Sequence, residues 1–158
     1  LGNNAEKTAE LMTNLKKYGQ YELTNFDSEM LALFAAEYAT EVETAAEIKR
    51  VYETSNYIED PHTAVASAVY HAYRKSSGDQ SPTVIASTAS PYKFPRVVVS
   101  AVGGKDPKDD FAAVRELSRL SGVSVPRAVD GLETAEVRHR KVVATAGMQK
   151  AVESYLGI

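Results

Sequence analysis

No cysteine occurs at any of the 158 positions of the sequence. This absence excludes disulfides, zinc sites built from thiolates and a cysteine nucleophile, and it is consistent with the cytoplasmic location that we expect. No apolar run approaches the roughly 18 residues of a membrane span, and the N-terminus carries no basic-then-apolar signal sequence. We therefore expect no membrane partner.

Basic residues are not in excess, because 18 lysines and arginines face 21 aspartates and glutamates, for a formal net charge of -3. A nucleic-acid-binding surface needs a basic excess on one face, so we expect no nucleic-acid partner. Hydrophobic residues make up 44% of the chain and charged residues 25%, which is ordinary for a globular protein. The length suits one domain with a core of its own.

The chain begins at Leu1 without an initiator methionine. Apolar residues at helical spacing start almost at once and predict a helix over residues 4–18, with Asn4 as its cap and Gly19 at its end. We interpret this beginning as that of a piece of a longer polypeptide, cut by design or by proteolysis.

Three further helices are expected in the first half of the chain. One follows Asp27 and carries the apolar residues Met30, Leu31, Phe34 and Tyr38. The next follows Thr40, which opens the S/T-x-x-E pattern of a capping box. The third follows Asp60, a good cap, with Pro61 at the first helical position, where no amide donor is needed.

The second half is expected to alternate strands and helices. Residues 83–87 are a short run without alternation, typical of an interior strand of a parallel sheet, and residues 137–143 suit an edge strand. Helices are predicted over residues 96–102 and 107–121, and Thr145 is predicted to cap a last one. The pattern therefore predicts a helix-rich α/β fold with a few parallel strands, mainly helical over 1–80 and built of strand–helix units over 81–158.

Asp60 and His62 stand at the start of a predicted helix. Free backbone amides at such a start favour an anion or a polar ligand. The simpler interpretation is that Asp60 only caps the helix and that His62 is a surface side chain, which is the commoner case.

A second polar cluster, residues 87–94, lies just past the predicted strand at 83–87. In open α/β sheets, ligands bind outside the carboxyl ends of the strands. The cluster has hydroxyls at Thr88 and Ser90 and a lysine, Lys93, between two aromatic residues. The alternative, which we weigh equally, is a turn in which Ser90 is a cap.

A basic run covers residues 138–141. Such a run either binds phosphate or, more often, is a solvated edge that discourages aggregation. A small hydrolase using His62, His71 or His139 is formally a third class of function, but the sequence contains no G-x-S-x-G elbow.

Two motifs at a fixed spacing resemble the C-terminal signature of threonine synthases. They read Asp60-Pro61-His62-Thr63-Ala64-Val65 and Pro82-Thr83-Val84-Ile85-Ala86-Ser87-Thr88-Ala89-Ser90-Pro91-Tyr92-Lys93-Phe94-Pro95. Residues 4–12 and 57–62 also resemble that family, in the same order. The resemblance covers residues 1–102 well, and the tail is less distinctive. It implies that residues 1–158 are a single C-terminal region, a helix-rich fragment of the pyridoxal-phosphate large domain.

The resemblance also implies an activity. Threonine synthases are pyridoxal-phosphate enzymes that convert O-phosphohomoserine and water to threonine and phosphate. Their Schiff-base lysine and the loop that holds the cofactor phosphate lie upstream, and neither is recognisable in this sequence. We therefore expect the fragment to be inactive alone and not to bind the cofactor by itself.

Within the family pattern, Thr88 matches the hydroxyl that hydrogen-bonds the pyridine nitrogen. A neutral hydroxyl does not force that nitrogen to stay protonated, as an aspartate would. Ser90 follows in the same turn, although the family form has histidine there. Asp60 and His62 match a segment near the ring, and Lys93 is assigned to the substrate.

One alternative function remains open, and self-association is also expected. The chain could be a non-catalytic binding or interaction domain that only shares ancestry with the enzyme, and the identity of the parent reading frame separates the two. If the piece was cut from a larger sheet, unpaired edges and bare apolar surface favour self-association, through residues 83–87 or their neighbours.

Overall fold

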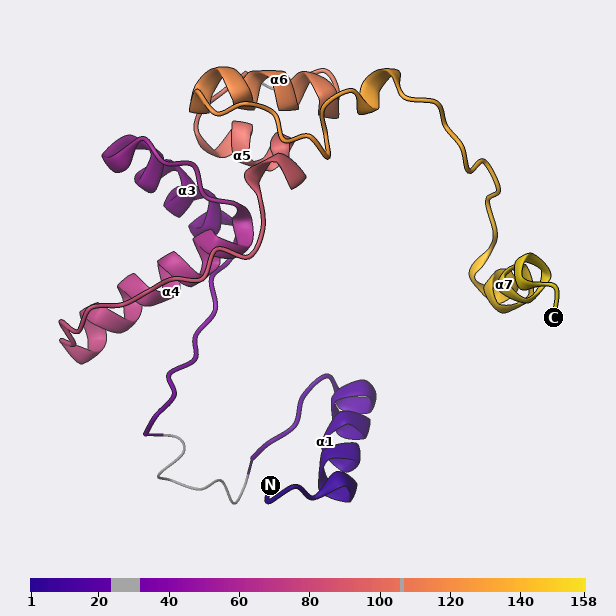
Figure 1. Ribbon diagram of the computed structural model, residues 1–158. Helices are drawn as coiled ribbons and strands as arrows, with labels where there is room; N and C mark the ends of the chain where they lie inside the picture. The colour runs from indigo at the N-terminus through magenta and orange to yellow at the C-terminus, as the bar shows by residue number, and fades with distance from the viewer. Residues whose placement is uncertain (24–31, 106) are drawn as a thin grey trace.

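The computed structural model describes residues 1–23, 32–105 and 107–158. Within these residues the regular structure is entirely helical and contains no β-strand (Figure 1). The predicted α/β class with a few parallel strands is therefore wrong. The elements in chain order are α1 (Ala5–Tyr18), α3 (Glu41–Ser55), α4 (Pro61–Ser77), η1 (Pro91–Lys93), α5 (Pro95–Ala101), α6 (Asp110–Ser121), η2 (Leu132–Thr134), η3 (Thr145–Gly147) and α7 (Met148–Leu156).

Both predicted strands, residues 83–87 and 137–143, are irregular chain. Val84 is 94% exposed, so this segment lacks the cover on both faces that an interior strand requires. A strand also needs a neighbour to pair its backbone groups, and the described residues provide none. Apolar and β-branched content is therefore not enough to form a strand here.

Local capping signals, by contrast, mark the starts of α1, α3 and α4 correctly. The side chain of Asn4 caps α1, and Gly19 ends that helix in the left-handed conformation. Thr40 and Glu43 form a reciprocal capping box at α3, in which Glu43 accepts from the Thr40 amide at 2.8 Å. Asp60 caps α4 as expected.

The remaining helix predictions agree with the structure only in part. The helices predicted over 96–102 and 107–121 correspond to α5 and α6. Thr145 does not cap a helix with its side chain, since it lies inside η3 and α7 begins at Met148. Of the helix predicted after Asp27, Asp27, Met30 and Leu31 lie outside the described residues, while Phe34 and Tyr38 are exposed and not helical.

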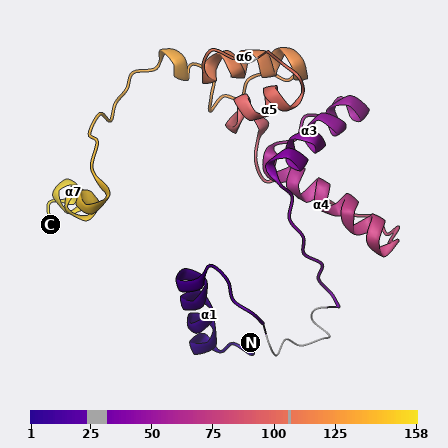
Figure 2. The ribbon, with the colours of Figure 1, turned by 180° about the vertical axis from the view of Figure 1, so that it is seen from behind.

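The core lies between four helices, because α3 packs on α4 and α5, and α5 packs on α6. Its buried apolar residues are Ile48, Ile58, Ala64, Tyr92, Val98, Val99, Val114 and Leu117. Helices α1 and α7 bury no residue and lie apart from this group in both views (Figures 1 and 2). In the described part of the chain, no helix combines the length and the apolar character needed to cross a membrane.

Candidate functional site

The start of α4 is organised by the carboxylate of Asp60, a side chain that is only 1% exposed. Its Oδ1 accepts from the amides of His62 at 2.9 Å and Thr63 at 3.4 Å, and its Oδ2 accepts from the Thr63 hydroxyl. Burial opposes the ionisation of Asp60, but these hydrogen bonds outweigh it and hold its pKa below the ordinary value. Two amides at this helix start are thus already satisfied by the chain's own carboxylate.

His62 connects the start of α4 with the second motif. Its imidazole is exposed, and Nδ1 lies 3.3 Å from Oδ1 of Asp60. Its ring centroid is 5.1 Å from that of Phe94, with the planes tilted by 49°. The His62 side chain therefore stands between a buried carboxylate and an aromatic ring.

A hydrogen bond also joins the two motifs directly. The hydroxyl oxygens of Thr63 and Ser87 lie 3.1 Å apart, although the residues are 24 positions apart in the chain. The next residue, Thr88, is exposed, and its hydroxyl makes no hydrogen bond to any described residue. The exposed Thr88 therefore directly follows the residue through which the two motifs are hydrogen-bonded.

The turn after Thr88 is a short helical turn with a firm anchor. The Ser90 hydroxyl accepts from the Tyr92 amide at 3.3 Å and caps η1, which confirms the capping interpretation of Ser90. Tyr92 is buried, and its hydroxyl donates to the Val123 carbonyl at 2.5 Å. Lys93 is exposed, with its ammonium 5.7 Å from the ring centroid of Phe94.

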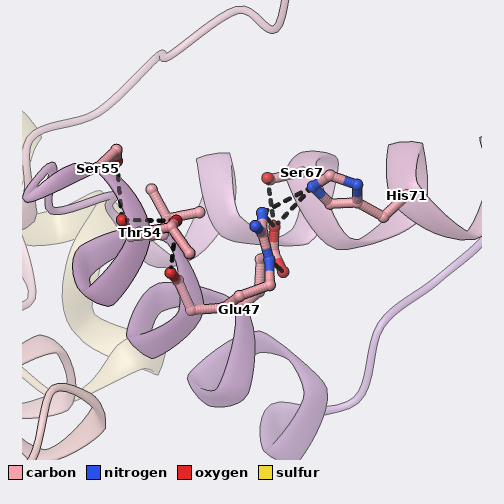
Figure 3. Close-up of polar contacts among 7 residues, drawn as sticks. Glu47, Thr54, Ser55, Ser67 and His71 are labelled. Carbon is pink, nitrogen blue, oxygen red and sulfur yellow. Dashed lines mark hydrogen bonds and ion pairs between the residues drawn. The ribbon is translucent and has the colours of Figure 1, made fainter.

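A further polar cluster, which the sequence did not predict, lies between α3 and α4 (Figure 3). Glu47 accepts two hydrogen bonds from Arg50, at 2.7 and 2.8 Å, and one from the Ser67 hydroxyl at 2.6 Å. His71 Nε2 lies 2.7 Å from Arg50 Nη2 and 3.4 Å from Glu47 Oε1. The hydrogen bonds from Arg50 hold the pKa of Glu47 below its ordinary value in spite of burial.

Glu59 is a buried carboxylate beside this cluster and next to Asp60 in the chain. It is 6% exposed, and its Oε2 has no hydrogen-bond partner among the described residues. Loss of hydration, reinforced by the charge of Glu47, raises its pKa. The spacing of Glu47 and Arg50 on one helix could have predicted their ion pair. No local sequence pattern predicts that Glu59 is buried.

The histidines are not arranged for nucleophilic hydrolysis. Ser67 donates its hydroxyl proton to Glu47 rather than to His71, and it is buried. His139 lies with the basic run 138–141 in exposed irregular chain, so the predicted strand edge does not exist there. The polar contacts of the His62 ring are with Asp60.

Comparisons with known proteins agree on one family. Residues 63–155 match the family model described as "Threonine synthase, C-terminal". The threonine synthase of Pseudomonas aeruginosa is 32% identical over 107 residues, which are 67% of this chain and 22% of that protein. Threonine synthase-like 1 of Mus musculus is 41% identical over 73 residues, 46% of this chain and 9% of that protein.

A solved structure is also similar, the pyridoxal-phosphate-bound threonine synthase from Brucella melitensis. It is 30% identical, with a TM-score of 0.49, and the alignment covers 78% of this chain and 25% of that one. The chain spans less than a quarter of the length of the two curated relatives named above. The family match extends through the tail that looked less distinctive, and it includes more than half of the residues. The chain therefore belongs to the threonine synthase family.

Proposed function

We propose that this chain supplies one side of the pyridoxal-phosphate site of a threonine synthase, which converts O-phosphohomoserine and water to threonine and phosphate. The observation that carries the proposal is the Thr63–Ser87 hydrogen bond. It holds the two family motifs together and leaves the Thr88 hydroxyl exposed and unengaged within the described residues. On this view residues 1–158 are one C-terminal region of a cytoplasmic enzyme.

In this proposal the residues of the two motifs border one edge and one face of the pyridine ring of the cofactor. Thr88 offers a neutral hydroxyl as a hydrogen-bond partner for the ring nitrogen, and His62 with Phe94 offers aromatic surface beside it. When bound, the cofactor supplies the electron sink of the reaction. A hydroxyl at its nitrogen does not enforce protonation there, so Thr88 tunes the cofactor rather than fixing its charge.

The other assigned residues take supporting roles in the same proposal. His62, which packs against Phe94, is proposed to line the side of the cofactor ring, and Ser90 is proposed to act mainly by shaping the turn that follows Thr88. Asp60 faces the helix amides rather than open space, so it contributes by holding the start of α4. Lys93 is exposed and cationic, which suits the anionic groups of the phosphorylated substrate.

The test changes Thr88 in an intact threonine synthase that carries this region. Thr88→Val removes the hydroxyl while keeping the shape, so cofactor binding should weaken several-fold and turnover should fall by more than stability does. A hydrogen bond of this kind is worth on the order of 1 kcal/mol, and more when its partner is left buried and unpaired. Thr88→Asp should force a protonated nitrogen and shift the cofactor absorption.

Thr88→Ser is the matched control, because it keeps the hydroxyl and should stay close to wild type. The measurements are cofactor affinity, absorbance and turnover, with thermal unfolding alongside. If Thr88→Val equals wild type in the first three, Thr88 is only a turn residue and the proposed site is wrong.

A further inference from the structure

We propose that Thr63 is a positioning residue, which fixes the segment carrying Thr88 against the start of α4 by joining the Asp60 carboxylate to the Ser87 hydroxyl. The inference rests on the proposed function of Thr88. In this proposal Thr63 does not touch the cofactor ring. It acts through Ser87 on the orientation of the Thr88 side chain.

The hydroxyl of Thr63 is placed and oriented by its surroundings. The residue is 5% exposed, and its hydroxyl donates to Oδ2 of Asp60. A hydroxyl has one proton and two lone pairs, and the proton of Thr63 is committed to an ionised carboxylate. The proton shared between Thr63 and Ser87, whose oxygens are 3.1 Å apart, is therefore that of Ser87. This gives a directed chain from Ser87 through Thr63 to Asp60.

The Asp60 end of this chain is rigid. Oδ1 of Asp60 is held by two amides of the first turn of α4, and the side chain is almost completely buried. A carboxylate bound on both oxygens has no freedom to follow Ser87, so Ser87 must follow it. The hydrogen bond thus transfers the fixed geometry of a helix start to an exposed segment.

The Ser87 end has little other polar support. Within the described part of the chain, residues 84–89 make no other hydrogen bond, and Val84 projects into solvent. The next anchor is Tyr92, whose hydroxyl reaches the Val123 carbonyl. Thr88 therefore lies between two anchors, and the one immediately before it is Ser87. Losing the Thr63 link frees the chain on that side.

Two substitutions test the Thr63–Ser87 hydrogen bond separately from the stability of the fold. Ser87→Ala removes the link at an exposed residue and leaves the Asp60 cap intact, and Thr63→Val removes the hydroxyl from the buried side. Thr63→Ser keeps the hydroxyl and is the matched control. Backbone order parameters of residues 86–90 are measured by NMR relaxation on the 158-residue chain. Cofactor affinity and absorbance are measured in the intact enzyme, with Thr88→Val beside them.

We expect the order parameters of residues 87–89 to fall from about 0.85 toward about 0.6 or below in Ser87→Ala and Thr63→Val, with α3 and α6 unchanged. Cofactor affinity should fall several-fold in both variants, and Thr63→Ser should match wild type. Unchanged order parameters in Ser87→Ala would overturn the proposal. So would unchanged cofactor affinity in Ser87→Ala while Thr88→Val loses affinity, an outcome that leaves the proposed function standing. If Thr88→Val itself has no effect, both fail.

Discussion

The hydroxyl of Ser67 on α4 donates a 2.6 Å hydrogen bond to the carboxylate of Glu47 on α3. The same carboxylate accepts both hydrogen bonds of the Arg50 fork, so three donors converge on one buried anion. Charge-assisted hydrogen bonds of this kind are stronger than neutral ones. The α3–α4 interface, which supports the start of α4, is thus polar at its centre as well as apolar.

Replacing Glu47 should destabilise the fold. Glu47→Gln puts an amide group among donors, and we expect a loss on the order of 2 kcal/mol in the free energy of unfolding, which is a fall of several degrees in melting temperature for a chain of this size. The control is Glu53→Gln on the same helix, where an exposed pair with Lys49 at 3.8 Å is worth little. Equal melting temperatures for the two variants would contradict the role of Glu47.

Glu59 should make stability depend on pH in a specific direction. Its pKa is raised in the folded state by burial, so the folded chain holds the proton more tightly than the unfolded chain. The contribution of protonated Glu59 to the free energy of unfolding is complete below the ordinary glutamate pKa. It is lost as the pH rises through the raised pKa of the folded state.

Glu59→Gln, which cannot ionise, should therefore be more stable than wild type at pH 7, with a melting temperature higher by a few degrees. The difference should shrink toward pH 4, where wild type is protonated. Thermal unfolding of both proteins from pH 4 to pH 8 measures this. A difference in melting temperature that stays constant across that range, or a variant less stable than wild type at pH 7, would contradict the prediction. Either result would show that burial does not make ionisation of Glu59 costly in free energy.

The 158-residue chain should not turn over O-phosphohomoserine, even with pyridoxal phosphate added. A lysine that attaches a carbonyl cofactor is activated by desolvation or by a cationic neighbour, whereas every lysine of this chain is exposed. Phosphate release measures turnover, and the intact threonine synthase of Pseudomonas aeruginosa serves as the positive control. Release of phosphate by the chain at a rate above the cofactor alone would refute the prediction.

Self-association remains a prediction, but the structure indicates a different surface for it. Residues 83–87 form no strand, so edge pairing there has lost its basis. Large apolar side chains are instead exposed along one face of α7, at Met148, Val152, Tyr155 and Leu156. Sedimentation velocity at rising concentration should show a species larger than the monomer.

Substituting Val152→Glu together with Leu156→Glu should restore the monomer, because it charges this face. Ser154→Glu, on the opposite side of the same helix, should leave association unchanged. A monomer at every concentration in the wild-type chain would remove the prediction.

Local chemistry determined much of this structure. Thr40 and Asp60 mark their helix starts because a cap forms within four residues, whatever the rest of the chain does. The same holds for Ser90, which could be predicted as a cap from the proline that follows it. Family membership was also readable, since the motifs around His62 and Thr88 stand in sequence at a fixed spacing.

The tertiary structure alone decided what residues 83–87 become and which polar groups meet. A strand exists only if another strand pairs with it, and the described residues provide no such strand. The contact of Ser67 with Glu47, and that of Ser87 with Thr63, join residues 20 and 24 positions apart. No local periodicity encodes such contacts, because they depend on how one helix or segment is laid against another. The sequence by itself suggested the residues of the candidate site, and packing joined the two motifs that carry them through Thr63 and Ser87.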